Sequence, residues 1–96
     1  MDLGTVIKNN RKQKGQTQEE FARACGITQT YLSQIEGNKK EPNLSTLKVI
    51  SDELEIPLPV LFFMSIDSED VPVEKKEQFE NIGPKVKALI SDFFGV

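Results

Sequence analysis

The sequence contains no histidine, no tryptophan and only one cysteine among its 96 residues. Without histidine, the usual zinc ligand sets and the Ser/His/Asp and Cys/His arrangements of nucleophilic enzymes cannot be assembled. A single cysteine cannot form an internal disulfide, which fits a reducing compartment. Glycine-rich phosphate loops and the acidic calcium-binding loop are also missing. We therefore expect a protein that is not an enzyme and that takes no metal and no cofactor.

Long apolar runs are missing as well. The longest, Val60–Met64, is far shorter than the ~20 residues that a membrane-spanning helix needs. Asp2 and Gly4 interrupt the first residues, which therefore lack the pattern of a secretion signal. Hydrophobic residues make up 38% of the chain and charged residues 28%, the balance of a globular domain. The expectation is a cytoplasmic protein with one sizeable core and no membrane partner.

The net charge of −3 is unevenly distributed along the chain. Residues 1–40 carry seven Lys and Arg against four Asp and Glu, whereas residues 41–96 carry five against eleven. A polyanion responds to the local patch that it meets, because salt screens charges beyond ~8–10 Å. The asymmetry is equally consistent with an ordinary solvated surface. Charge alone therefore permits a nucleic-acid partner without indicating one.

Capping residues divide residues 3–63 into five short helical segments, and no segment longer than a few residues alternates in the manner of a strand. Thr17 and Glu20 form a capping box, in which each side chain can bond to the backbone amide of the other residue. Gly26 can end the second segment in a left-handed conformation. The other expected N-caps and helix ends are Thr28, Asn43, Gly15 and Gly37–Asn38. This pattern predicts a compact all-α bundle.

Apolar residues recur at helical spacing within each segment and predict the side chains of the core. They are Leu3, Ile7, Phe21, Ala22, Cys25, Ile27, Leu32, Ile35, Leu44, Leu47, Ile50, Leu54, Leu58, Leu61 and Phe62. Pro57 and Pro59 bracket the last of the five segments. We interpret Cys25 as a packing residue, with a thiol switch as the alternative.

Beyond the bundle, residues 65–71 form an acidic linker and residues 72–96 a C-terminal helical extension. Pro72 suits the first position of a helix in this extension. An apolar seam repeats there at intervals of three and four residues, at Phe79, Ile82, Val86, Leu89 and Phe93. Gly83–Pro84 in its middle predicts two short helices or one kinked helix. The seam either packs back on its own domain or dimerises, and the sequence leaves both alternatives open.

The most informative stretch is residues 17–36, where two short helices are joined through Gly26. Ala22 precedes this turn by four residues, and a small side chain there lets two helices cross at a steep angle. A solvated helix face usually carries Lys and Glu, whereas a helix that reads the DNA major groove needs amides and hydroxyls. The outward side of the second helix carries such uncharged groups, at Gln29, Thr30, Ser33 and Gln34. The stretch therefore favours a base-reading helix over an ordinary polar surface.

Across residues 3–63 the sequence resembles the helix-turn-helix transcription regulators of the phage repressor and Cro type, also called the xenobiotic response element type. Small residues, caps and apolar positions match together, at Arg11, Thr17–Glu20, Ala22, Gly26, Ile35–Glu36, Pro42, Leu44, Leu47, Ile50, Leu58, Leu61 and Phe62. The resemblance implies a five-helix bundle of the lambda-repressor-like type in residues 1–64. It also implies a nucleoid-associated protein that binds double-stranded DNA sequence-specifically as a homodimer. No small-molecule ligand is evident.

Carried over position by position, the resemblance assigns the helix over residues 28–36 to the major groove. The expected base contacts are Gln29, Thr30 and Gln34. The expected phosphate contacts are Gln18, Thr28, Ser33, Asn38, Lys39 and Lys40, joined by Lys8, Lys12 or Lys14 only if these face the duplex. Tyr31 either packs on a sugar or thymine methyl group or covers the bundle.

Arg11 and Glu36 match an ion pair that ties the first helix to the end of the third. The alternative is that Arg11 contacts phosphate directly. Asn10 and Gln16 depart from the family, because an apolar residue is common at their positions, and Gly37–Asn38 lacks a phosphate-facing arginine that is usual there. These departures predict modest affinity and modest stability.

A dimer of this type places its two reading helices ~34 Å apart, which predicts a near-palindromic operator with half-site centres ~10–11 base pairs apart. The dimer contact is expected on the fifth helix, where an apolar cluster exceeds what a small helix buries, at Leu58, Val60, Phe62, Phe63 and Met64. Repression is the preferred function, although the sequence does not separate it from activation. The alternative is a protein-interaction module, antitoxin-like or a regulatory partner, that uses the acidic residues 41–96.

Overall fold

The N-caps predicted from the sequence, Thr17, Thr28 and Asn43, begin three of the helices. The computed structural model describes residues 1–96, and it contains α-helices and short 3-10 turns but no strand. The helices are α1 (Leu3–Gln13), α2 (Gln18–Cys25), α3 (Gln29–Glu36), α4 (Leu44–Leu54), α5 (Leu58–Ser65) and α6 (Lys76–Phe94). Two 3-10 turns, η1 (Ser68–Asp70) and η2 (Val73–Lys75), lie between α5 and α6. The predicted all-α fold, a five-helix bundle with a C-terminal helical extension, is confirmed.

Reciprocal hydrogen bonds form the capping box at the start of α2. The Thr17 hydroxyl accepts from the Glu20 amide at 3.1 Å, and the Glu20 carboxylate accepts from the Thr17 amide at 2.9 Å. Gly26 ends α2 with φ +71°, a conformation that glycine adopts without steric cost. Gly37–Asn38 ends α3 as expected: Gly37 is the C-cap with φ −86°, and Asn38 takes the left-handed conformation with φ +57°.

The core lies among the first five helices. Its buried hydrophobic side chains are Ile7, Phe21, Ala22, Cys25, Leu32, Ile35, Leu47, Ile50, Leu54, Ile56 and Leu61. Leu44, which the periodicity assigns to this set, is 56% exposed. At 3.6 residues per turn, Leu44 and Ile50 lie to opposite sides of Leu47 on the helix surface. Leu44 also begins α4, so that its side chain lies past the edge of the core.

Gly4 makes the closest approach between α1 and α3. A Cβ atom at this position would lie 2.4 Å from the Ile35 carbonyl oxygen and 2.6 Å from that of Glu36. Real Cβ atoms do not approach oxygen so closely, and these oxygens belong to backbone that cannot rotate away. The absence of a side chain at Gly4 therefore allows the start of α1 to pack on the end of α3.

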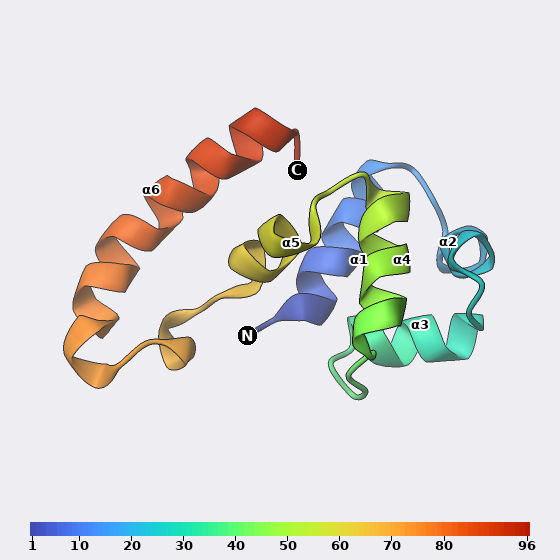
Figure 1. The fold of residues 1–96 in the computed structure, drawn as a ribbon, viewed down its shortest axis with the longest axis horizontal. Coiled ribbons are helices and arrows are strands. Elements are labelled where there is room, and N and C mark those ends of the chain that lie inside the picture. The colour runs from blue at the N-terminus through green and yellow to red at the C-terminus, as the bar shows by residue number, and fades with distance from the viewer.

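The extension α6 lies apart from the core. Figure 1 shows it at one end of the long axis, beside α5, with α2 and α3 at the other end of a molecule that measures 42 × 27 × 19 Å. Helix α6 packs on α5 and on the two 3-10 turns. Gly83 is its one buried residue, so α6 adds no side chain to the core. None of the helices combines the length and the apolar character needed to cross a bilayer.

One expectation for the extension is wrong in detail. The α-helix begins at Lys76 rather than Pro72, because Pro72 caps the short turn η2. Of the two alternatives that Gly83–Pro84 predicts, two short helices or one kinked helix, the structure has a single helix that continues through Pro84. Proline removes the hydrogen bond to the carbonyl four residues earlier, that of Glu80. Both residues are exposed, so water can bond to the freed carbonyl, and the helix is maintained.

Replacement of Gly4 by alanine tests the close approach of α1 and α3. We expect Gly4→Ala to lower the free energy of unfolding by about 1–3 kcal/mol, because the new methyl group forces the two backbones apart. Gly37→Ala is the matched control, since its φ is negative and its nearest non-neighbouring atom would lie 3.3 Å from the new Cβ. Urea unfolding followed by circular dichroism gives both values. Equal stability of the two variants would contradict the assignment.

Burial governs the chemistry of the single cysteine. Cys25 is 8% exposed, and burial raises the pKa of its thiol to about 11. Relative to the ordinary thiol pKa of 9.0, the reactive thiolate is about a hundredfold rarer at pH 8. We expect iodoacetamide to label Cys25 at least that much more slowly in the folded protein than in urea. The unfolded chain ionises first, so the stability from this site is present below pH 9 and is lost toward pH 11. Fast labelling of the folded protein would favour a thiol switch.

Candidate nucleic-acid interface

The outward side of α3 presents four uncharged polar side chains in one row. Gln29, Thr30 and Ser33 are exposed and Gln34 is half-buried. None of these four side chains makes a hydrogen bond within the protein, because every bond at α3 uses backbone atoms or the flanking residues Thr28 and Glu36. Their amide and hydroxyl groups are therefore free to bond to a ligand along this helix.

A buried hydrogen-bond network fixes the orientation of α3 relative to α1 and α2. Arg11, 6% exposed, donates from Nε and Nη2 to the two carboxylate oxygens of Glu36 at 2.7 and 3.0 Å. Its Nη1 donates to the Gln16 carbonyl at 2.7 Å, and Gln18 Nε2 donates to Glu36 at 3.0 Å. Arg11 thus pairs with Glu36 and, being buried, is not presented to solvent. Gln18, an expected phosphate contact, therefore uses its amide group in a hydrogen bond to the same carboxylate.

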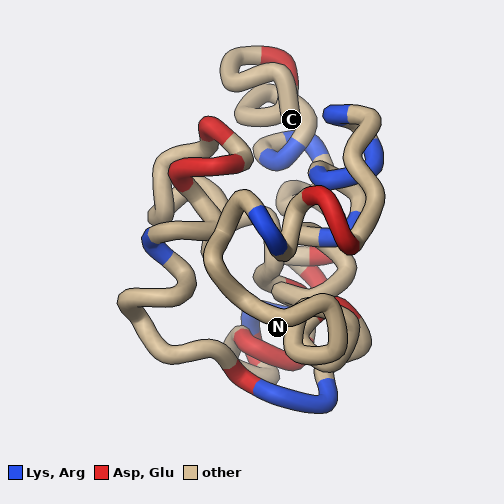
Figure 2. Tube along the Cα trace, turned by 90° about the vertical axis from the view of Figure 1, so that its right-hand side faces the viewer, with Lys and Arg blue, Asp and Glu red and all other residues tan.

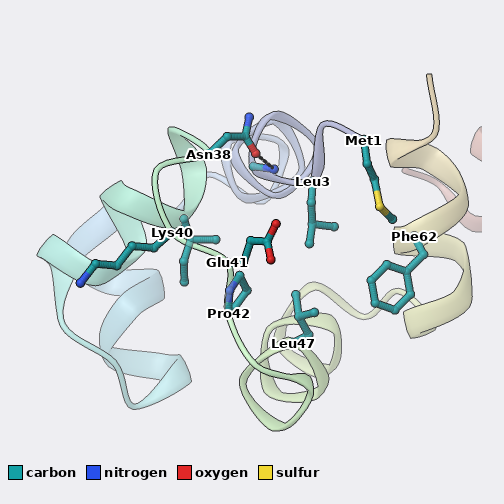
Figure 3. A pocket seen from close by; sticks show the side chains of 10 residues that line it. Met1, Leu3, Asn38, Lys40, Glu41, Pro42, Leu47 and Phe62 are labelled. Atoms are coloured by element: carbon teal, nitrogen blue, oxygen red, sulfur yellow. Dashed lines mark hydrogen bonds between the residues drawn. The ribbon is translucent and has the colours of Figure 1, made fainter. Parts of the chain in front are cut away.

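The loop after α3 is tied to the start of α1 through Asn38. Its Oδ1 accepts from the Gly4 amide at 2.9 Å, drawn as a dashed line in Figure 3, and its Nδ2 donates to the Asp2 carboxylate at 2.6 Å. The bonds from Asn38 and Thr5 hold the pKa of Asp2 below its usual range. Asn38, an expected phosphate contact, therefore has its side chain occupied within the protein. It positions Lys39 and Lys40, and Figure 3 shows the Lys40 side chain directed away from the neighbouring groove.

That groove, of about 350 Å³, opens between the loop and the starts of α1 and α4. Leu3, Leu47, Pro42 and Phe62 make it largely apolar (Figure 3). The polar amide that borders it belongs to Asn38, whose hydrogen bonds are already satisfied by Gly4 and Asp2. The groove therefore supplies no free polar group to orient a small ligand, apart from the carboxylate of Glu41.

Ion pairs remove part of the positive charge of residues 1–40. Arg11 pairs with Glu36, Lys14 with Glu55 and Arg23 with Glu19. The basic side chains left exposed and without an ion pair are Lys8, Lys12, Lys39 and Lys40. Figure 2 looks at the end of the molecule with α2 and α3, where blue and red segments are interspersed without a continuous basic face. Non-specific attraction for a polyanion is therefore confined to a small area.

Two further predicted site residues have clear positions. The Thr28 hydroxyl caps α3 by accepting from the Tyr31 amide at 3.0 Å, which leaves its own O–H free to donate outward. Tyr31 is half-buried and packs against the core, so it covers the bundle.

The apolar residues of α5 are less accessible than the sequence suggests. Leu58, Val60 and Phe62 are half-buried against the core of their own chain. Phe63 is half-buried and lines an open groove beside α6. The three most exposed apolar side chains, Phe93, Val73 and Leu89, lie instead on α6 and the turn before it.

Sequence reasoning missed the residues that position the site from a distance. In the sequence, Asp2 and Gly4 served only to exclude a secretion signal. In the structure both form hydrogen bonds with Asn38, in the loop that carries Lys39 and Lys40. The signal that could have found them was Asp2 as the N-cap of α1, where its carboxylate accepts from the Thr5 amide at 3.2 Å. Gln16 is a departure from the family, and its buried Oε1 has no hydrogen-bond partner, an arrangement that costs stability.

Removal of Arg11 tests whether the network supports both folding and recognition. We expect Arg11→Ala to lower the free energy of unfolding by about 3–5 kcal/mol, because Glu36 is left buried without its partner, and to weaken DNA binding in parallel. Lys48→Ala is the control, an exposed lysine of α4 outside the expected contacts, whose replacement costs under about 0.5 kcal/mol. Urea unfolding measures stability and fluorescence anisotropy measures binding. An Arg11→Ala protein with normal stability but no binding would make Arg11 a phosphate contact.

Comparison with known proteins agrees with this arrangement of helices. A family model described as helix-turn-helix matches residues 7–61, which include all of α2, α3 and α4. No solved structure matches the chain.

Several named proteins are similar in sequence. The chain is 42% identical to the ImmF control region 10 kDa protein of Bacillus phage phi105 over 59 residues, 62% of this chain and 66% of that protein. It is 33% identical to the immunity repressor protein of the same phage over 94 residues, 96% of this chain and 65% of that protein. It is 35% identical to the transcriptional regulator SinR of Bacillus subtilis over 60 residues, 62% of this chain and 54% of that protein.

The chain thus covers less than two thirds of the length of each of these relatives. The similarity to the immunity repressor extends over nearly the whole chain, α6 included. The match to the family model covers more than half of the chain, and the helices that it spans carry the polar row and the network beneath it. The chain belongs to the helix-turn-helix family of DNA-binding transcription regulators, the family of the phage repressors and regulators that it resembles.

Proposed function

We propose that the protein is a repressor that binds a near-palindromic operator as a homodimer, with α3 of each copy in the major groove. The observation that carries the proposal is the row Gln29, Thr30, Ser33 and Gln34, which is polar, uncharged and free of bonds within the chain. A helix placed in the major groove meets donors and acceptors on every base pair, and amides and hydroxyls can bond to them without the desolvation cost of a charge.

In this proposal Gln29, Thr30 and Gln34 contact base edges. An amide bonds bidentately to adenine, so each half-site should contain at least one adenine. Phosphate contacts come from Thr28 and Ser33 beside the row and from Lys39 and Lys40 in the loop. Gln18 joins them by turning a donor from Glu36 to phosphate. Asn38 contributes by holding the loop in place, because its side chain is bonded to Gly4 and Asp2.

Repression is favoured over activation by the relatives. One is named an immunity repressor, and its similarity covers 96% of this chain. A twofold dimer would place two α3 helices ~34 Å apart, which sets the half-site centres ~10–11 base pairs apart. We include the exposed parts of Leu58, Val60, Phe62, Phe63 and Met64 of α5 in the contact between copies.

Selection of binding sites from a random DNA duplex library tests the proposal. We expect a palindrome with adenine in each half, bound at physiological salt by the intact protein. Gln29→Ala/Gln34→Ala should lose about 1–3 kcal/mol per amide, a factor of roughly 5–150 for each, and only on the selected site. Circular dichroism checks that the double variant keeps its helices.

Lys39→Ala/Lys40→Ala is the contrasting variant. It should weaken binding to selected and scrambled duplexes alike, and it should make the slope of log K against log salt shallower by about 0.9 for each phosphate that the variant no longer neutralises. A well-folded dimer that enriches no sequence would contradict the proposal. That result would favour the alternative, a protein-interaction module that uses the acidic residues 41–96.

A further inference from the structure

Helix α6 carries an apolar row that its own chain leaves uncovered. Ile82 is 54% exposed, Leu89 70% and Phe93 82%. On a helix of 3.6 residues per turn these three lie within one narrow sector, together with the half-buried Phe79 and Val86. The sector lies beside the face that packs on the bundle, which is centred on the buried Gly83. Three large exposed side chains on one helix face are an interaction surface.

A groove with an almost wholly apolar lining lies beside the first half of this row. It has a volume of about 300 Å³ and is formed where α5 meets α6, by Phe63, Val71, Phe79, Ile82, Gly83 and Val86, with Lys75 and Gln78 also in its lining. The second half of the row, at Leu89 and Phe93, has no such groove beside it and projects outward. The first half of α6 therefore borders an apolar groove, and its last turn carries a protruding aromatic ring.

We infer that this surface binds a second copy of the chain, with the two α6 helices antiparallel and Phe93 of each copy in the groove of the other. The inference deepens the proposed function, since it names the contact surface of the proposed homodimer. The occupant follows from self-complementarity. A twofold contact needs a hollow and a projection on the same surface, and α6 carries both.

The spacing along α6 fits this arrangement. Phe79 and Phe93 are fourteen residues apart, which is about 21 Å along a helix. If the twofold axis passes near Val86, midway between them, Phe93 of one copy lies beside Phe79 and the groove of the other. Ile82 then lies near Leu89 of the partner copy. Every member of the row gains an apolar neighbour in this register and Phe93 enters the groove, whereas in a parallel pair Phe93 meets the other Phe93 and leaves the groove unfilled.

Charges at the edge of the row make the inference more specific. Asp92 precedes Phe93, and Lys75 lines the groove, so an antiparallel pair brings opposite charges together at both ends. Lys85 lies on the outer edge near the twofold axis, where it would face Lys85 of the other copy. Salt screens this exposed like-charge contact. Lys85→Gln should therefore tighten the dimer by roughly twofold at low salt, the effect of one such contact.

Sedimentation of the full chain without DNA gives the first test. We expect the wild-type protein to dimerise, and Phe93→Asp to weaken the dimer at least about a hundredfold, because the substitution removes the aromatic anchor from both grooves of the dimer. Val73→Asp is the matched control, because Val73 is 80% exposed but lies outside both the row and the groove, and it should leave the dimer unchanged. A monomeric wild-type protein, or a Phe93→Asp protein that dimerises normally, would overturn the inference.

Crosslinking tests the antiparallel register. Gln78→Cys and Asp92→Cys proteins, mixed and treated with a short bis-maleimide, should crosslink with one another, and neither should crosslink efficiently with itself. The parent chain gives the background, because its one cysteine, Cys25, is buried. Self-crosslinking of each variant without mixed product would show a parallel pair and overturn the register.

Binding to a single half-site separates the inference from the proposed function. Phe93→Asp should bind an isolated half-site as well as the wild-type protein does, while losing the additional affinity for the full palindrome. If the wild-type protein reads the half-site but stays monomeric, the surface inference fails and the proposed reading helix stands. If it dimerises but selects no sequence, the reverse holds.

Discussion

The orientation of α3 depends on one buried carboxylate. Glu36 accepts two hydrogen bonds from Arg11 on α1 and one from Gln18 on α2, so a single side chain at the end of α3 joins three helices. A carboxylate that is 5% exposed is tolerable only with such partners, because an unpaired charge in that position is strongly destabilising. Because the buried Arg11 and Glu36 have few other partners available, their hydrogen bonds hold the backbones of α1 and α3 in one relative position. The polar row on the other side of α3 takes its direction from this geometry.

A second set of contacts completes the support of α3 from its C-terminal end. Gly4 lets the backbone of α1 approach the last carbonyls of α3, and Asn38 then closes the gap with hydrogen bonds to Gly4 and Asp2. Asn38 does this from a left-handed conformation, which asparagine tolerates better than most residues. The loop that presents Lys39 and Lys40 is therefore held at its root, while the lysine side chains stay exposed. The contacts of Asn38 thus set the position of the loop, and the charges of Lys39 and Lys40 stay available to a ligand.

The helices and most of the core could be predicted because their signals are local. Thr17 with Glu20, Gly26 and Asn43 act within four residues of chain, and Phe21 and Leu32 lie where the helical period places them. Asn38 could not be understood in this way, since its partners are 34 and 36 residues away and the family pattern pointed to phosphate. Pro84 left two alternatives open for a related reason, because local propensity does not say whether the freed carbonyl of Glu80 is exposed to water, as it is in the single helix observed. The base and phosphate contacts remain predictions.

The placement of α6 separates the residues that form the core from the residues of the exposed apolar row. Its side chains take no part in the eleven-residue core, and it lies at the opposite end of the molecule from α3 (Figure 1). Substitutions on the outer face of α6 are therefore expected to have little effect on folding or on the orientation of α3. In the proposed dimer, this segment can change which chain it associates with during divergence while the DNA sequence bound by α3 stays the same. Two duplicated genes in one cell could in this way encode subunits that no longer mix although they still share a target.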